Sequence, residues 1–260
     1  MNDEPLTGYT VLVTRSKRQA PALKRLIENA GGETFVLPLI ETVPVKERWE
    51  EHVDTLKHAT FDWIVFTSAN AVRFFYDAWK ESGKALPTNV KIAAIGSKTA
   101  QKVARLGWPI HVTPSEFVAE ELADVLVKHV TRGETVLFPR SALARHVIRP
   151  ALEDIGASVI DMPIYTSAPV VENKATLRKW IQEGVLDVLT FTSPSTVKAF
   201  VSFIQEIERE KWQQLRTVCI GPITEREAAH HGFQHIIVAK PYTIEGMVQA
   251  LISHVNKEGT

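Results

Sequence analysis

The stretch Val11-Leu-Val-Thr-Arg-Ser16 is repeated 125 residues later as Val136-Leu-Phe-Pro-Arg-Ser141 in this chain of 260 residues. The same offset, without any insertion, relates Phe66-Thr-Ser68 to Phe191-Thr-Ser193 and Ile95-Gly96 to Ile220-Gly221. Chance matches would drift out of register along the chain. The spacing therefore predicts one α/β unit that is present twice, with two similar surfaces between which a ligand could bind.

The composition is that of a globular protein, with 45% hydrophobic and 23% charged residues. The length suits two domains of roughly 100–150 residues each. Thirty Lys and Arg residues balance thirty Asp and Glu residues, so no net charge favours nucleic acid or an anionic membrane. The one cysteine, Cys219, excludes an intramolecular disulfide, and no apolar run approaches the ~20 residues that span a bilayer. The stretch from Met1 to Pro5 lacks a basic leader, so we expect a cytoplasmic protein.

Short β-rich runs alternate with amphipathic stretches, a pattern that predicts parallel sheets covered by helices. In repeat one we expect strands at 10–14, 34–45, 63–67, 91–95 and 110–113. In repeat two we expect them at 135–139, 158–170, 188–192, 217–220 and 236–239.

Two of these segments, 34–45 and 158–170, are about twice as long as an ordinary strand of ~5–6 residues. Each contains two prolines, which suit edge or bridging positions. We therefore interpret both as connectors that leave one sheet and enter the other, so that the first strand and helix join the later strands of repeat two. The alternative is two sequential domains divided near residue 132, and periodicity does not choose between them.

Polar residues follow the first, third and fourth strands of each repeat, where ligands bind in doubly wound sheets. Helix amino termini at such loops offer backbone N–H groups to carboxylates or phosphates. Ser, Thr and Asn are also favoured helix caps, so the same residues could serve the fold alone. Arg15 and Arg140 carry guanidinium forks that suit a carboxylate, with a structural ion pair as the alternative. The candidate binding residues are Thr14, Arg15, Ser68, Ala69, Asn70, Thr99, Arg140, Ser193, Ser195, Gly221 and Thr224.

Tyr165 lies in the second connector, within Pro163-Ile-Tyr-Thr-Ser-Ala-Pro169, and its counterpart in the other repeat is Ile40. If the connectors line a cleft, this phenol could donate a proton or a hydrogen bond to a substrate. Otherwise it is a half-buried linker aromatic. No Gly-x-Gly-x-x-Gly motif follows a strand, and no acidic or cysteine ligand stands at metal spacing near the histidines, so we expect neither a nucleotide cofactor nor a metal.

Taken together, these segments resemble uroporphyrinogen-III synthase over nearly the whole chain. The segments that carry the resemblance are Val13-Thr-Arg15, Phe66-Thr-Ser-Ala-Asn70, Ile95-Gly96, the Tyr165 connector, Phe191-Thr-Ser-Pro-Ser195 and Ile220-Gly-Pro-Ile-Thr224. The resemblance implies a lyase that takes hydroxymethylbilane, a linear tetrapyrrole rich in carboxylates. It removes the terminal hydroxyl as water and closes the ring to uroporphyrinogen III with the last pyrrole, ring D, inverted. No metal or organic cofactor is implied, and a monomer is expected.

The resemblance also implies roles for individual residues. Tyr165 would assist departure of the hydroxyl. The residues that match substrate-binding positions of the family are Ser68, Asn70, Ser193 and Thr224.

The family architecture is two α/β domains joined by two strands, which supports the crossed arrangement. The predicted fold is therefore α/β, with two flavodoxin-like parallel-sheet domains that arise from an internal duplication and are joined by a two-stranded β connector. Residues 1–38 with 167–260 form one expected domain and 39–166 the other, with connectors at about 36–45 and 161–170.

Two functions of other classes remain open. Two α/β lobes hinged by paired strands also describe a cytosolic small-molecule-binding sensor without catalytic activity. A two-lobed sugar transferase would need an acidic metal site, which is not apparent in the sequence. Neither a DNA-binding helix pair nor a basic face is apparent, so we expect no nucleic-acid partner.

Overall fold

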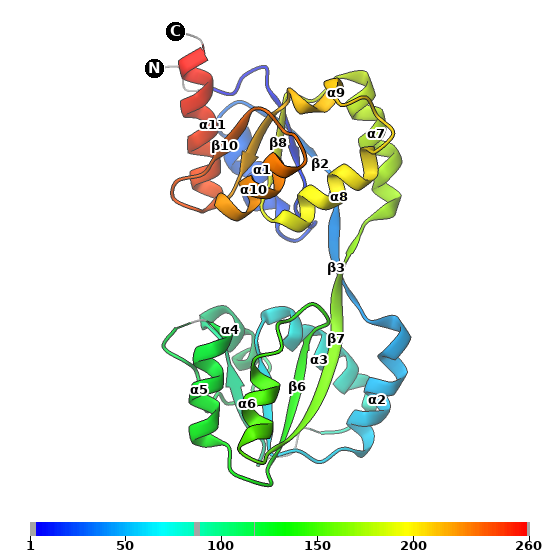
Figure 1. The fold of residues 1–260 in the computed structure, drawn as a ribbon, viewed down its shortest axis with the longest axis vertical. Coiled ribbons are helices and arrows are strands. Elements are labelled where there is room, and N and C mark those ends of the chain that lie inside the picture. Colours follow the sequence, from blue (N-terminus) through cyan, green and yellow to red (C-terminus); the bar gives the residue numbers. More distant parts are fainter. Residues whose placement is uncertain (1–3, 86–88, 117, 259–260) are drawn as a thin grey trace. The chain divides into compact units, whose positions relative to one another are not determined.

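The computed structural model describes residues 4–85, 89–116 and 118–258, and the chain divides into two compact units. Unit 1 combines Met1–Glu41 with Ala168–Thr260, and unit 2 is Thr42–Ser167. Each unit has a sheet with helices packed on it, which confirms the predicted α/β class (Figure 1). No helix in the described part of the chain has the length and apolar character needed to cross a membrane.

The sheet of unit 1 has the strand order β10-β9-β8-β1-β2, with parallel pairing throughout. Its elements are β1 (Thr10–Val13), α1 (Ala20–Glu28), β2 (Glu33–Val36), η2 (Val171–Asn173), α7 (Lys174–Glu183), β8 (Val188–Phe191), α8 (Pro194–Ile204), α9 (Glu210–Gln213), β9 (Arg216–Cys219), α10 (Pro222–His230), β10 (Ile236–Val238) and α11 (Ile244–Glu258). Strand β1 lies between β2 and β8, so strands from both ends of the chain share one sheet. A sequential division near residue 132 does not describe this arrangement.

The sheet of unit 2 has the order β3-β7-β6-β4-β5, and the pairings among β7, β6, β4 and β5 are parallel. Its elements are β3 (Ile40–Pro44), η1 (Lys46–Arg48), α2 (Trp49–His58), β4 (Trp63–Phe66), α3 (Ala69–Ser82), β5 (Lys91–Ala94), α4 (Ser97–Ala104), α5 (Ala119–His129), β6 (Thr135–Ser141), α6 (Ile148–Asp154) and β7 (Ser158–Pro169). Strands β3 and β7 are neighbours, and each contains the point where one unit gives way to the other.

Successive residues of the central strands pack on opposite faces of each sheet. In unit 1, Leu12 belongs to the core beneath α7 and α8, whereas Val11 and Val13 belong to the core beneath α1 and α11. In unit 2, Phe66 and Val65 divide between the two faces in the same way. Both faces are therefore covered, which explains why these strands read as continuous apolar runs.

One polar contact occurs at the same place in both units. The Asp62 carboxylate accepts a hydrogen bond from the Thr135 amide at 2.8 Å. The Asp187 carboxylate accepts one from the Thr10 amide at 2.7 Å. Both members of the second pair lie 125 residues from a member of the first, so the offset found in the sequence also relates contacts in space.

The long segment expected at 34–45 forms two strands instead of one. Strand β2 ends at Val36, the Leu37 amide still donates to the Val13 carbonyl at 3.0 Å, and β3 begins at Ile40. Pro38 intervenes and has no N–H to continue the ladder. The segment at 158–170, by contrast, forms the single strand β7.

The strand expected at 110–113 is wrong, because the structure has only an isolated bridge between Val112 and Ala93 there. Prolines on each side of the segment cannot donate to a ladder. The Ile92 amide donates to Nδ1 of His111 at 3.0 Å, so a side chain takes a position that a strand carbonyl could have filled.

Candidate functional site

In each unit the predicted site residues follow the carboxyl ends of neighbouring parallel strands. Unit 1 holds Thr14, Arg15, Ser193, Ser195, Gly221 and Thr224, after β1, β8 and β9. Unit 2 holds Ser68, Ala69, Asn70, Thr99 and Arg140, after or at the ends of β4, β5 and β6, together with Tyr165 on β7. Because adjacent parallel strands end at one edge of a sheet, each unit gathers its own set at one edge.

The side chain of Tyr165 is held by two contacts within unit 2. Its hydroxyl lies 2.7 Å from Oγ of Ser68, and its ring stacks on Phe74 with centroids 5.4 Å apart and an interplanar angle of 12°. The residue is only 8% exposed. The guanidinium of Arg73 lies over the Phe74 ring, 4.2 Å from its centroid. The ring stack and the hydrogen bond therefore fix the direction of the phenol.

Ser68 is both the cap of α3 and the partner of the phenol. Its Oγ accepts a hydrogen bond from the Ala71 amide at 3.0 Å. A serine hydroxyl has one proton and two lone pairs, so Oγ can accept from this amide and still exchange a hydrogen bond with Tyr165. Ser68 therefore caps a helix and also contacts the Tyr165 hydroxyl.

The equivalent serine of unit 1, Ser193, has different hydrogen-bond partners. Its Oγ caps α8 by accepting from the Thr196 amide at 3.4 Å, and it lies 2.9 Å from Oγ of Ser195, which is exposed. At the position that corresponds to Tyr165, unit 1 has Ile40, which packs against the core. Unit 1 therefore offers hydroxyls but no phenol at this place.

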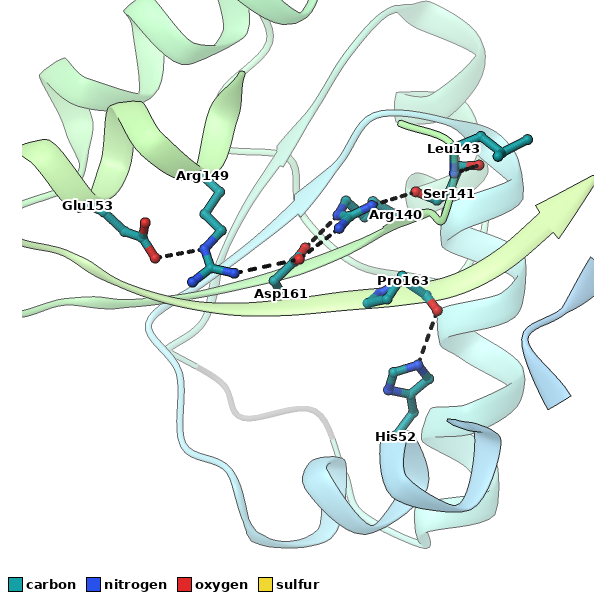
Figure 2. Close-up of polar contacts among 8 residues, drawn as sticks. All are labelled: His52, Arg140, Ser141, Leu143, Arg149, Glu153, Asp161 and Pro163. Atoms are coloured by element: carbon teal, nitrogen blue, oxygen red, sulfur yellow. Dashed lines mark hydrogen bonds and ion pairs between the residues drawn. The ribbon is translucent and has the colours of Figure 1, made fainter. Parts of the chain in front are cut away.

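Arg140 is paired with a carboxylate of its own sheet (Figure 2). Its Nε donates to Oδ1 of Asp161 at 2.5 Å and its Nη2 to Oδ2 at 2.7 Å, while Nη1 donates to the Ser141 carbonyl at 2.9 Å. The two side chains are 8% and 15% exposed. The structure shows the ion pair that the sequence left as the alternative for Arg140, and this pair already fills the carboxylate-binding fork.

Two further titratable side chains, Arg149 and His52, lie near this pair (Figure 2). Arg149 lies 3.8 Å from Asp161 and forms a closer ion pair with Glu153, at 2.7 Å. His52 is buried, and its Nε2 lies 3.1 Å from the Pro163 carbonyl, which can only accept, so Nε2 carries a proton. Burial lowers the pKa of His52, so the ring is neutral near pH 7.

The side chain of Thr14, another predicted site residue, is turned into the core of unit 1. Thr14 is fully buried, and its hydroxyl donates to the Thr190 carbonyl at 2.6 Å. Thr190 in turn donates to the Leu12 carbonyl at 2.7 Å. These hydroxyls fasten β1 to β8 inside the core.

The remaining candidates lie at helix amino termini. Thr99 and Thr224, 5% and 3% exposed, lie in the first turns of α4 and α10. Gly221 precedes α10 with extended backbone, and Ala69 and Asn70 are half-buried at the start of α3. These positions share the positive end of a helix dipole, which favours an anion.

Asp161, which pairs with Arg140, and His52, which contacts the Pro163 carbonyl, were not predicted from the sequence. The signal that would have found them is a charged or titratable residue without a counterpart at the 125-residue offset. Val36 stands opposite Asp161 in this alignment, and Leu177 stands opposite His52.

The side chains offer little for metal or thiol chemistry. Within the residues that the structure describes, no three His, Cys, Asp or Glu side chains form a group that could hold a metal ion. Cys219 lies in the core of unit 1, and burial raises the pKa of its thiol to about 12. It is therefore protonated, and not nucleophilic, at neutral pH.

Comparison with known proteins identifies the family. Residues 21–249 match the family described as Uroporphyrinogen-III synthase HemD. The chain is 30% identical over 251 residues to the porphyrin biosynthesis protein HemD of Ruminiclostridium josui. This match covers 96% of the chain but only 49% of that longer protein. It is also 30% identical over 247 residues to a putative uroporphyrinogen-III synthase of Methanothermobacter thermautotrophicus, covering 92% of the chain and 96% of the relative.

A solved structure shares the fold. It is a mutant uroporphyrinogen III synthase from the bacterium Thermus thermophilus, with a TM-score of 0.61 and 20% identity, and the match covers 96% of this chain and 100% of the other. The family match spans far more than half of the sequence, and the strand-end motifs after the first helix lie within it. This chain belongs to the uroporphyrinogen-III synthase family.

Proposed function

We propose that this chain cyclises hydroxymethylbilane to uroporphyrinogen III, with inversion of ring D and loss of water. The observation that carries the proposal is the family match over residues 21–249, which includes strand-end loops of both units. The reaction needs a scaffold that holds a flexible polycarboxylate in one folded geometry, since the free substrate closes without inversion. The protein would thus act in tetrapyrrole biosynthesis as a cyclising hydro-lyase.

The substrate carboxylates would be bound by the helix amino termini of both units. Backbone N–H groups and the dipole of a helix favour anions at this end. The residues that we assign to substrate binding are Arg15, Ser68, Ala69, Asn70, Thr99, Ser193, Ser195, Gly221 and Thr224. Many weak anchors of this kind suit a ligand that must be folded and not merely held.

Tyr165 would act as the acid that assists loss of the hydroxyl. The phenol donates its proton to the terminal hydroxyl, the carbon–oxygen bond breaks with its electron pair on oxygen, and water leaves. The pyrrole-stabilised cation that remains is attacked by ring D, giving a spiro intermediate that fragments and recloses in the inverted sense. Ser68, 2.7 Å from the phenol, can donate a hydrogen bond to the phenolate that forms, and the phenolate regains its proton from the ring carbon that loses one at ring closure. Because Oγ of Ser68 accepts a hydrogen bond from the Ala71 amide, its own O–H remains free to donate to Tyr165.

We also propose that the two units arose by duplication as flavodoxin-like domains, and that β3 and β7 are the two-stranded connector. Support comes from the matched carboxylate contacts of Asp62 and Asp187 and from the sheet order of unit 1, which is that of flavodoxin-like sheets. The domain limits would be residues 1–38 with 167–260, and 39–166.

We propose that the working enzyme is a monomer in the cytoplasm and has no nucleic-acid partner. The balance of thirty basic and thirty acidic residues supports the absence of a nucleic-acid partner. Light scattering at working concentration checks the monomer, and a dimer would contradict it.

The test of function is an isomer-resolved cyclisation assay. The protein is incubated with freshly generated hydroxymethylbilane, and the products are oxidised and separated into type I and type III isomers. We expect type III to dominate with the protein and type I without it. Dominant type I in both samples would contradict the proposal and favour a binding protein without catalytic activity.

A further inference from the structure

Each unit has an arginine at the same position, but within the described residues only one of the two arginines is paired with a carboxylate. Arg15 and Arg140 are 125 residues apart, at the ends of β1 and β6. In unit 2 the strand register pairs Phe138 with Asp161, and in unit 1 the equivalent register pairs Val13 with Val36. The carboxylate that fills the fork of Arg140 is therefore replaced by a valine in unit 1.

The guanidinium of Arg15 has no such partner. The Nε–H group of Arg15 is buried and, among the residues described, donates no hydrogen bond. Burial lowers the pKa of Arg15, and the charge of Glu245 opposes that shift without forming an ion pair. Arginine stays protonated in proteins, so a partly desolvated positive charge remains, with the charge of Glu245 nearby but no carboxylate of the described part of the chain in contact with it.

We infer that Arg15 binds a carboxylate of the tetrapyrrole in the position that Asp161 takes at Arg140, and that Arg140, whose fork Asp161 fills, does not take this role in unit 2. The inference rests on the proposed function. The pair in unit 2 shows the geometry to expect, with two parallel hydrogen bonds from Nε and Nη2 to the two carboxylate oxygens. A valine at residue 36 keeps the protein from filling this position itself.

Val36→Asp is the sharpest variant, because it adds an internal carboxylate at the matching register. We expect it to raise KM for hydroxymethylbilane about tenfold, the factor for losing one charge-assisted contact, with a smaller change in kcat. Arg15→Gln should raise KM to a similar extent. Val36→Asn is the matched control, similar in shape but uncharged, and should keep a KM near that of the wild type.

A double-mutant cycle adds a readout that is independent of activity. Val36→Asp should lower the melting temperature less in the wild-type background than in Arg15→Gln, because Arg15 can pair with the new carboxylate. If Val36→Asp fails to fold, the KM of Arg15→Gln decides.

Unchanged KM in these variants, with type III still formed, would overturn the inference and leave the proposed function intact. A wild-type protein that leaves type I dominant would overturn the proposed function, and with it the substrate named here.

Discussion

Unit 1 and unit 2 keep the same core but differ where chemistry is expected. Phe66 and Phe75 pack with ring centroids 5.4 Å apart in unit 2, and Phe191 and Phe200 pack with centroids 5.5 Å apart in unit 1. These pairs correspond at the 125-residue offset. Contacts that stabilise each fold have thus remained equivalent.

Two differences at the strand ends matter for the proposed chemistry. Unit 2 has the phenol of Tyr165, where unit 1 has Ile40. Unit 1 has an unfilled guanidinium at Arg15, whereas Asp161 fills that of Arg140. The comparison teaches that, where two units share a core, separate roles can arise at equivalent positions that differ in residue, as at Tyr165 and Ile40, or in partner, as at Arg15 and Arg140. In our account unit 2 supplies the acid and unit 1 supplies the cation.

The largest expected effect comes from making unit 2 resemble unit 1. Asp161→Val removes the partner of Arg140 and leaves a buried charge, which should lower the free energy of unfolding by about 3–5 kcal/mol. Urea denaturation measures the loss. The double variant Arg140→Met with Asp161→Val should recover much of it, because a buried ion pair can be replaced by apolar groups. Equal stability of Asp161→Val and the wild type would show that the pair is not structural.

The next effect concerns the phenol of Tyr165, whose place in unit 1 is taken by Ile40. Tyr165→Phe keeps the ring stacked on Phe74 but removes the proton donor, so kcat should fall about a hundredfold while KM changes little. Tyr76→Phe, on α3 of the same unit, is the matched control and should keep its kcat. A folded Tyr165→Phe variant with wild-type kcat would remove the proposed acid.

The smallest effect is a pH dependence of stability that belongs to unit 2 alone. His52 is buried and its pKa is lowered, so the unfolded chain takes up protons before the folded one does as the pH falls below about 6.5. Stability contributed by neutral His52 is fully present above that pH and is lost on acidification towards its folded pKa. His52→Leu, which installs the residue of unit 1, should flatten this part of the profile in thermal melts. A profile unchanged by the substitution would assign the acid sensitivity to other groups.

Much of the fold could be predicted because burial on both faces of a sheet leaves a clear pattern. The run at 63–67 predicts a strand, and β4 is Trp63–Phe66. The failures have local causes that the pattern does not encode. At 110–113 the apolar residues Ile110 and Val112 alternate with polar ones, but a histidine side chain enters the hydrogen bonding in place of a strand.

The site was harder to predict because a polar residue at a strand end has several possible partners. Sequence alone does not reveal that Thr14 turns inward to the Thr190 carbonyl, or that Arg140 meets Asp161 on the adjacent strand. Both contacts depend on strand order and register, which come from tertiary structure. The proximity of Ser68 and Tyr165, 97 residues apart, has the same origin.

The central claim is that Tyr165 supplies the acid and Arg15 binds a substrate carboxylate. Its most direct test is a steady-state comparison of Tyr165→Phe and Arg15→Gln in one isomer-resolved assay. The account predicts that the first variant loses kcat with little change in KM, and that the second gains KM with a smaller change in kcat, while type III remains the enzymatic product of both. If both substitutions alter the same constant in the same way, or neither alters any, then the two units do not contribute the separate functions described here.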